Sequence, residues 1–282
     1  MPARTLYAAQ LATITPNAGG ACNLPVQSAS CELTLPVDDI MILGRLGSAG
    51  RFQKEVATCK ADLKVYLGTD NTDPNTLSGA FLSVLTGEAL AGNVSTVTVT
   101  PNGFIMSGIL THIGLELSLG IFGMGDFSFA GVGEPVFAAV PTTIGGAGTQ
   151  PGAAVAIVPL TTGVKIYDIT KTTFNNTCPK SVKFSLDIPN EIISCLGSPI
   201  SGSQVVVAAG NVQVAKPPFH YTLVCEGTAA EASSKLVFGE TNACITIVAN
   251  DGVLQQRGFN QAAGDVGSSY NFSVEGSDCT IS

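Results

Sequence analysis

The most constraining feature of this sequence is an alternating pattern that occurs twice. Residues 31–37 place Cys, Leu, Leu and Val on one side and Glu, Thr and Pro on the other. Residues 182–188 repeat the alternation in the same phase, 151 positions later. Because successive side chains of a strand point to opposite faces, both segments are predicted to be strands with one buried face.

The features that follow each strand also occur twice, in the same order. Each strand runs into a Gly- and Ser-rich loop, and the next alternating segment begins at Cys59 in the first half and at Phe219 in the second. Asn102-Gly103 and Asp251-Gly252 then predict hairpin turns, because both turn residues need positive φ. The segment 127–131 matches a segment 145 positions later. We therefore expect an internal duplication.

Each half also contains one stretch with helical spacing. Residues 76–89 carry apolar side chains three and four positions apart, and the second half has a shorter stretch at 229–238. The predicted fold is all-β with one short helix per repeat, arranged as two tandem, similar β-barrel or sandwich domains. We expect the domains at 1–139 and 164–282, with the Pro- and Gly-rich residues 140–163 as a linker.

Composition indicates a surface that other subunits cover. Charged residues make up only 12% of the chain, about half the usual share, whereas hydrophobic residues make up 45%. The net charge of −8 is unsuited to holding a phosphate backbone and suits a surface that DNA passes without sticking. No apolar run is long enough to predict a membrane span, and the N-terminus lacks a convincing signal-peptide cleavage site.

The sequence offers little material for catalysis. Histidine occurs only as His112, which is interpreted as structural, and His220. No nucleophile elbow, zinc-protease motif or phosphate-binding loop is present, so we expect no enzyme activity, no cofactor and no metal site. None of the eight cysteines forms a CxxC pair; buried free thiols are the favoured interpretation, with disulfides as the alternative.

Three segments together carry a resemblance to a known family. Leu35–Ile40, then Leu43–Arg51, then the strand at 59–67, resemble the opening of phage tail tube proteins. The resemblance implies a structural subunit of the virion tail, assembled in the bacterial cytoplasm into stacked rings around a channel for DNA. Doubled domains imply trimeric, pseudo-hexameric rings. The implied partners are further copies and other tail proteins, with no membrane.

The resemblance also implies which residues make the contacts. Residues 44–55 and 195–218 would be the ring-stacking loops of the two domains. Arg45 and Arg51 either contact acidic groups of the adjacent ring or are solvated, whereas the second loop lacks Arg and favours apolar contact. The candidate stacking residues are Gly44, Arg45, Gly47, Gly50, Arg51, Lys54, Pro199, Gly202 and Val206. The candidate lumen-facing residues are Glu32, Asp62 and Asp187.

Two other structural roles remain open at this point. The cysteine content and three glycosylation-like sequons, at Asn93, Asn175 and Asn271, also fit a two-domain β-sandwich adhesin or pilus subunit. A phage decoration or minor tail protein is a related alternative. A count of free thiols and electron microscopy would separate these roles from a tail tube.

Overall fold

The computed structural model describes residues 11–41, 43, 46–47, 49–53, 57–67, 77–100, 103–118, 123–137, 164–167, 178–189, 217–226, 235–238, 245–262 and 269–282. The expected linker, 140–163, lies outside these residues. In chain order the elements are β1 (Leu11–Thr15), β2 (Cys22–Thr34), β3 (Val37–Ile40), β4 (Gly50–Gln53), β5 (Thr58–Tyr66), α1 (Gly79–Leu90), β6 (Ser95–Thr100), β7 (Phe104–Ser118), β8 (Met124–Val132), β9 (Val136–Phe137), β10 (Val164–Tyr167), β11 (Cys178–Asp187), β12 (Phe219–Glu226), β13 (Lys235–Phe238), β14 (Ile245–Ala249), β15 (Val253–Asn260), β16 (Ser269–Gly276) and β17 (Cys279–Ile281).

The first half closes into a six-stranded antiparallel barrel. Its strands pair in the cycle β1–β2–β5–β8–β7–β6 and back to β1. Alternate residues of β5 fill the interior, as the pattern at 59–67 predicts, and Phe127 and Phe129 of β8 pack against them. Side chains of this size fill so narrow a barrel completely.

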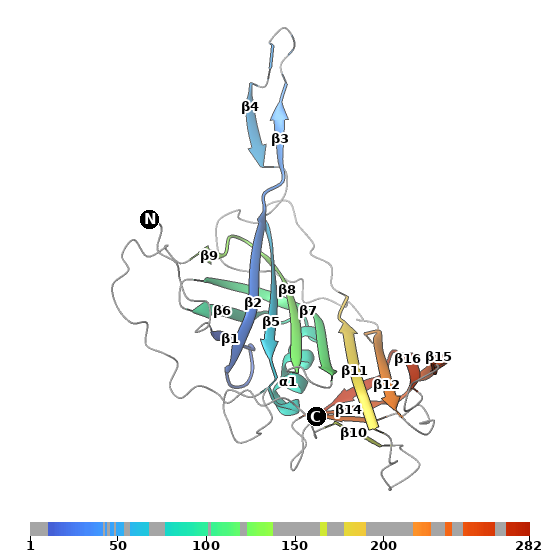
Figure 1. The fold of residues 1–282 in the computed structure, drawn as a ribbon. Helices are drawn as coiled ribbons and strands as arrows, with labels where there is room; N and C mark the ends of the chain where they lie inside the picture. The colour runs from blue at the N-terminus through green and yellow to red at the C-terminus, as the bar shows by residue number, and fades with distance from the viewer. Residues whose placement is uncertain are drawn as a thin grey trace, which may run out of the picture.

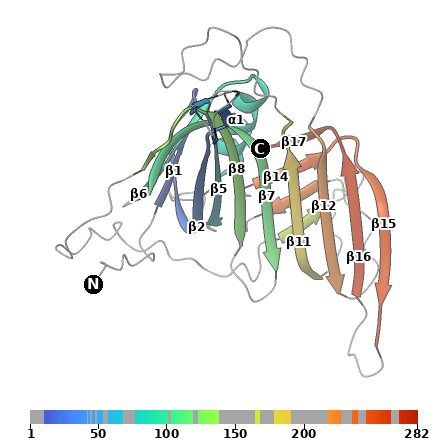
Figure 2. The ribbon, with the colours of Figure 1, turned by 90° about the horizontal axis from the view of Figure 1, so that it is seen from above.

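Strand β7 connects this barrel to the second half of the chain. Along one edge of β7, the residues from Ile105 to Gly108 pair with β6. The residues from His112 to Ser118 pair with β11, from Asp187 to Ser181. The sheet then continues through β12 and β16 to β15 (Figures 1 and 2). The two halves therefore share one continuous sheet. A four-stranded sheet, β10–β13–β14–β17, packs with it around a common core.

The two halves contribute the same four-strand path to this sheet. The order β2–β5–β8–β7 in the first half corresponds to β11–β12–β16–β15 in the second. Ala61 pairs with Phe129, and the residues 160 and 145 positions later, Tyr221 and Val274, also pair with each other. The strand pairs therefore correspond in register as well as in order.

Both halves also carry two β-bulges at corresponding positions. The pairing of β2 with β5 skips Gln27, and the pairing of β11 with β12 skips Lys180. The pairing of β7 with β8 skips Thr111, and that of β15 with β16 skips Gln255. The skipped residues Gln27 and Lys180 are 153 positions apart, two more than the spacing of 151 read from the alternation.

Helix α1 covers one end of the core, and the expected second helix is wrong where the structure describes it. Ser78 caps α1 by accepting a hydrogen bond from the backbone N–H of Phe81 at 3.2 Å. The helix buries Leu82 and Leu85 and lies against β7, β14 and β17. In the second half, Lys235–Phe238 is instead strand β13, because β10 and β14 pair with its two edges.

Two further expectations need correction. Leu35 and Val37 were predicted to face the core but are 47% and 52% exposed, because β2 ends at Thr34 and Pro36 cannot donate a ladder hydrogen bond. Asp251-Gly252 does not form a hairpin turn. It carries the chain from β14 in one sheet to β15 in another, and the Asp251 carboxylate accepts hydrogen bonds from the backbone N–H groups of Ser277 and Asp278.

Candidate functional site

A two-stranded arm projects from the barrel (Figure 1). It consists of β3 and β4, which pair from Val37 opposite Gln53 to Ile40 opposite Gly50. Arg51 Nε donates to Asp39 Oδ1 at 2.7 Å across the two strands. Gly47 has a φ of 89° in the loop at the tip, a conformation that favours glycine. The arm is thus a defined hairpin that extends away from the rest of the chain.

The arm exposes many apolar side chains. Leu43 and Leu46 at the tip are fully exposed, and Met41 is 70% exposed. An isolated two-stranded hairpin is marginally stable in water, and contiguous exposed apolar side chains usually mark an interaction surface. The arm is therefore a candidate interaction surface.

The predicted stacking residues fall only partly on the described arm. Gly47, Gly50 and Arg51 belong to it, and Arg51 is paired with Asp39 of the same hairpin. That ion pair joins two exposed side chains and is worth at most about 1 kcal/mol. The other predicted stacking residues lie outside the described residues: Gly44, Arg45, Lys54, Pro199, Gly202 and Val206.

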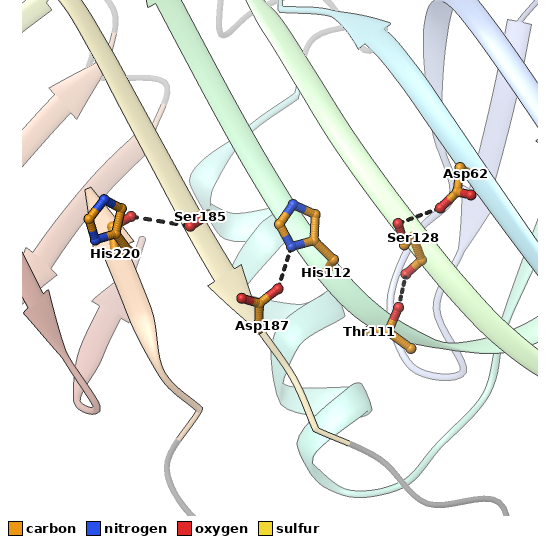
Figure 3. A network of polar contacts seen from close by, with 7 residues as sticks. All are labelled: Asp62, Thr111, His112, Ser128, Ser185, Asp187 and His220. Atoms are coloured by element: carbon orange, nitrogen blue, oxygen red, sulfur yellow. Dashed lines mark hydrogen bonds and ion pairs between the residues drawn. The ribbon is translucent and has the colours of Figure 1, made fainter. Parts of the chain in front are cut away.

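One face of the continuous sheet carries polar side chains, and the three predicted lumen residues share it. Glu32 lies opposite Lys60 on β5, and Asp62 is on the same face of that strand. Asp62 Oδ1 accepts a hydrogen bond from Ser128 Oγ at 2.6 Å, and Asp187 Oδ1 lies 2.6 Å from Nδ1 of His112 (Figure 3). The structure therefore brings residues from β2, β5 and β11 onto one surface.

Three lysines on this polar face each lie near a carboxylate. Lys60 lies 3.1 Å from Asp62, and Lys64 lies 3.8 Å from Asp126. Further along the sheet, Lys183 pairs with Glu116 at 2.8 Å. All of these side chains are substantially exposed, so each pair adds little stability. Their main consequence is that the lysines on this face already have carboxylate partners.

Sequence reasoning missed two cross-strand partners on this face. His220 Nδ1 lies 3.2 Å from Glu275 Oε1, although the residues are far apart in the chain. The β12–β16 register places them directly opposite each other. His112, interpreted as structural, is likewise held by Asp187 across the β7–β11 pairing. The matching offsets of the two halves were the only sequence signal for the β12–β16 register.

Two strand edges of the sheet lack a pairing strand in the described part of the chain. β15 pairs with β16 along one edge, and the later part of β2, from Ser28 to Thr34, pairs with β5 along one edge. β15 also exposes Val253, Leu254 and Phe259. Long apolar edges promote unwanted pairing unless another strand covers them. These two edges are therefore candidate interfaces.

The structure describes the side chains of four cysteines, and Cys31, Cys59 and Cys279 among them are free thiols. Cys22 and Cys59 are buried, whereas Cys31 and Cys279 are partly buried. Burial raises the pKa of the Cys22, Cys31 and Cys279 thiols to about 11, and also raises the pKa of Cys59. The interpretation as a buried free thiol is confirmed for Cys59, whereas Cys31 and Cys279 are free but only partly buried. A raised pKa keeps a thiol protonated near neutral pH, and the protonated thiol is a poor nucleophile. The other four cysteine side chains lie outside the described residues.

Two kinds of feature are absent from the described ranges. No three His, Cys, Asp or Glu side chains in those ranges are grouped so that they could hold a metal ion. None of the described segments forms a helix with the length and apolar character needed to cross a membrane. The arm, the polar face and the two open edges remain as the candidate functional surfaces.

Comparison with known proteins adds no family to this description. No protein-family model matches the chain, and no curated protein sequence matches it. What the chain does must therefore be inferred from its own surfaces.

Proposed function

We propose that this chain is a structural subunit of a phage tail tube, which assembles into stacked rings around a channel for DNA. The observation that carries the proposal is the repeated four-strand path within one continuous sheet. The role is non-enzymatic, the partners are further copies and other tail proteins, and the location is the virion tail. The resemblance at residues 35–67 supports the same role.

We infer that the two halves arose by duplication of one tube domain. Strand order, the β5–β8 and β12–β16 registers and two bulges correspond between them. Bulges are inserted residues that persist within a family, so two in corresponding places favour common origin over convergence. Gly131 and Gly276 also correspond, and in both places a Cβ atom would collide with a neighbour.

The duplication gives a physical route to a ring. Inside the chain, the two copies of the path join side by side through β7 and β11. Repeating this junction between chains extends the sheet in the same direction, and closure into a ring removes every open edge. Three doubled chains would supply six similar units, as the resemblance to tail tubes implies.

The polar face suits the wall of a DNA channel. The opposite face of the sheet packs on the apolar core, so the polar face is the one that can border water. Glu32, Asp62 and Asp187 lie on it, and the ion pairs occupy Lys60, Lys64 and Lys183. Lysines with carboxylate partners bind a phosphate backbone weakly, so DNA would slide past this wall.

The arm suits contact between successive rings. Its tip carries exposed Met41, Leu43 and Leu46, and its Arg51 is held within the hairpin by Asp39. We therefore assign stacking mainly to apolar burial by the arm. At about 25 cal/mol per Å² of apolar surface, burying each such side chain contributes about 1.5–3 kcal/mol.

Negative-stain electron microscopy of the purified protein tests this function. We expect rings or tubes with a central channel. A protein that remains monomeric at high concentration would overturn the proposal. Isolated trimers that never stack would favour a decoration protein, and a monomer whose cysteines are fully oxidised would favour an adhesin or pilus subunit.

A further inference from the structure

The junction inside the chain predicts the junction between chains in residue detail. β7 and β11 pair antiparallel, with Glu116 opposite Lys183 and Leu115 opposite Phe184. The two strands with an open edge, β15 and β2, are the counterparts of β7 and β11 in the repeated path. The same pair of strand types therefore meets at the internal junction and remains available at the two outer edges.

The bulges fix which residues correspond. Thr111 and Gln255 are the skipped residues of β7 and β15, so Leu115 corresponds to Phe259. Gln27 and Lys180 are the skipped residues of β2 and β11 in the same way. Counting from Gln27 and Lys180, Phe184 corresponds to Cys31 and Lys183 corresponds to Ser30.

We propose that β15 of one copy pairs antiparallel with β2 of a second copy in the register of the internal junction. This inference rests on the proposed function and specifies its ring interface. Since opposite residues keep their correspondence, the expected pairs are Gln256 with Thr34, Arg257 with Leu33, Gly258 with Glu32, Phe259 with Cys31, and Asn260 with Ser30 of the second copy.

The core-facing side of this register carries Phe259 and Arg257 of β15, opposite Cys31 and Leu33 of the second copy. Phe259 is 59% exposed, whereas its counterpart Leu115, which belongs to the core and lies opposite Phe184 of β11, is 1% exposed. Cys31 is only partly buried, whereas its counterpart Phe184 is 2% exposed. Pairing would place Phe259 against Cys31 of the second copy and complete at the outer edge the burial that the internal junction already has.

On the polar side of this register, no two side chains of like charge lie opposite each other. The internal Lys183–Glu116 ion pair is replaced by Ser30 opposite Asn260, two neutral groups that can form a hydrogen bond. Glu32 of the second copy would lie opposite Gly258, which has no side chain. The interface joins two different edges, so repetition gives a ring if the rotation closes and a helical filament if it does not.

Disulfide trapping tests the register. Ser30 and Asn260 are exposed, so the double variant Ser30→Cys/Asn260→Cys should fold normally. Directly opposite residues of an antiparallel pair have Cα atoms about 4.5–5.5 Å apart, within the range of a disulfide. The matched control is Ser28→Cys/Asn260→Cys, whose cysteines are displaced by two residues and are about 7–8 Å apart on the diagonal. The single variants report background from the native thiols.

After mild oxidation, we expect the matched pair to give covalent oligomers on non-reducing gels, while the displaced pair stays as single chains. Wild-type rings with equal or stronger cross-linking of the displaced pair would overturn the register and leave the proposed function standing. Cross-linking of the matched pair without any tube would uphold the register and overturn the tail-tube role. A cryo-EM map of wild-type rings would decide the register even if the variants failed to fold.

Discussion

The two halves of this chain contain the same four-strand path but complete it differently. In the first half, β6 pairs with both β1 and β7, and the sheet closes into a barrel. In the second half, β14 occupies the corresponding place in the chain but pairs with β13 and β17. β15 therefore has one open edge in the described structure, whereas β7 is paired along both edges.

The difference shows that the same four-strand path can form with or without the additional strands that close it into a barrel. A strand that closes a sheet removes an edge that would otherwise recruit another chain. The first half uses such a closing strand together with β11, and its interior is sealed within one molecule. The second half leaves the same kind of edge available, and we interpret that edge as the assembly surface.

The largest expected contrast is between the effects of two lysine substitutions, one at Leu115 and one at the corresponding residue, Phe259. Leu115→Lys would bury an ammonium group in the barrel, because Leu115 is 1% exposed, and we expect the protein not to fold. Phe259→Lys at the corresponding edge position should cost less than about 1 kcal/mol of monomer stability, mostly through its contact with Tyr270. It should nevertheless prevent ring formation. Circular dichroism and electron microscopy on both variants measure this; rings formed by Phe259→Lys would contradict the edge assignment.

A second comparison asks whether the halves unfold together. Leu63 and Leu223 occupy corresponding core positions and are 1% and 0% exposed. Replacing either with Ala should lower the free energy of unfolding by about 2–5 kcal/mol. Because one sheet and one core span both halves, we expect both variants to shift the same single transition in urea. Two separate transitions, each sensitive to only one variant, would show that the halves are independent.

Alanine substitutions at the two corresponding glycines, Gly131 and Gly276, should lower the free energy of unfolding by different amounts. A Cβ atom at Gly131 would collide with the backbone carbonyl of Ser107, which cannot move cheaply. At Gly276 it would meet the Phe219 ring and the Asp251 carboxylate, which are side chains rather than backbone. We expect Gly131→Ala to cost about 1–3 kcal/mol and Gly276→Ala less, as measured by urea unfolding. Equal costs would mean that the two sites are equally rigid.

The smallest expected effect concerns Asp251, which lies in the connection between β14 and β15. Hydrogen bonds from the Ser277 hydroxyl and the Asp278 backbone lower the pKa of Asp251. A lowered pKa gives stability at neutral pH that is lost as the pH falls through that lowered value, below about pH 4. Asp251→Asn should therefore be less stable than wild type at pH 7, with a gap that narrows in acid. A gap that stays constant down to pH 2 would show that the ionised carboxylate is not responsible.

Strand positions were well predicted because alternation reports burial directly. Leu63, Tyr221 and Leu223 face the core as the pattern indicates. The offsets of 160 and 145 relate the residues paired between β5 and β8 to those paired between β12 and β16. The spacing of 151 read from the alternation differs by two residues from the spacing between the Gln27 and Lys180 bulges. A shift of two leaves every side chain on the same face, so alternation alone cannot detect it.

The candidate site was predictable only in part. The sequence placed Glu32, Asp62 and Asp187 at outward strand positions, but their meeting on one surface depends on the pairing of distant strands. The sequence predicts a loop where the arm lies. Its apolar tip cannot be recognised as exposed from the sequence, because exposed apolar side chains look like core residues there. The partner of His220 needed the β12–β16 register.

By itself, the sequence determined that this chain is all-β, where most strands run and which of their side chains turn inward, because these properties follow from local alternation. Only the tertiary structure decided that one half closes into a barrel while the other ends in an open edge, and that residues 235–238 form a strand. Those outcomes depend on which distant strands compete for the same edge, and a strand edge presents the same backbone N–H and C=O groups whatever its sequence.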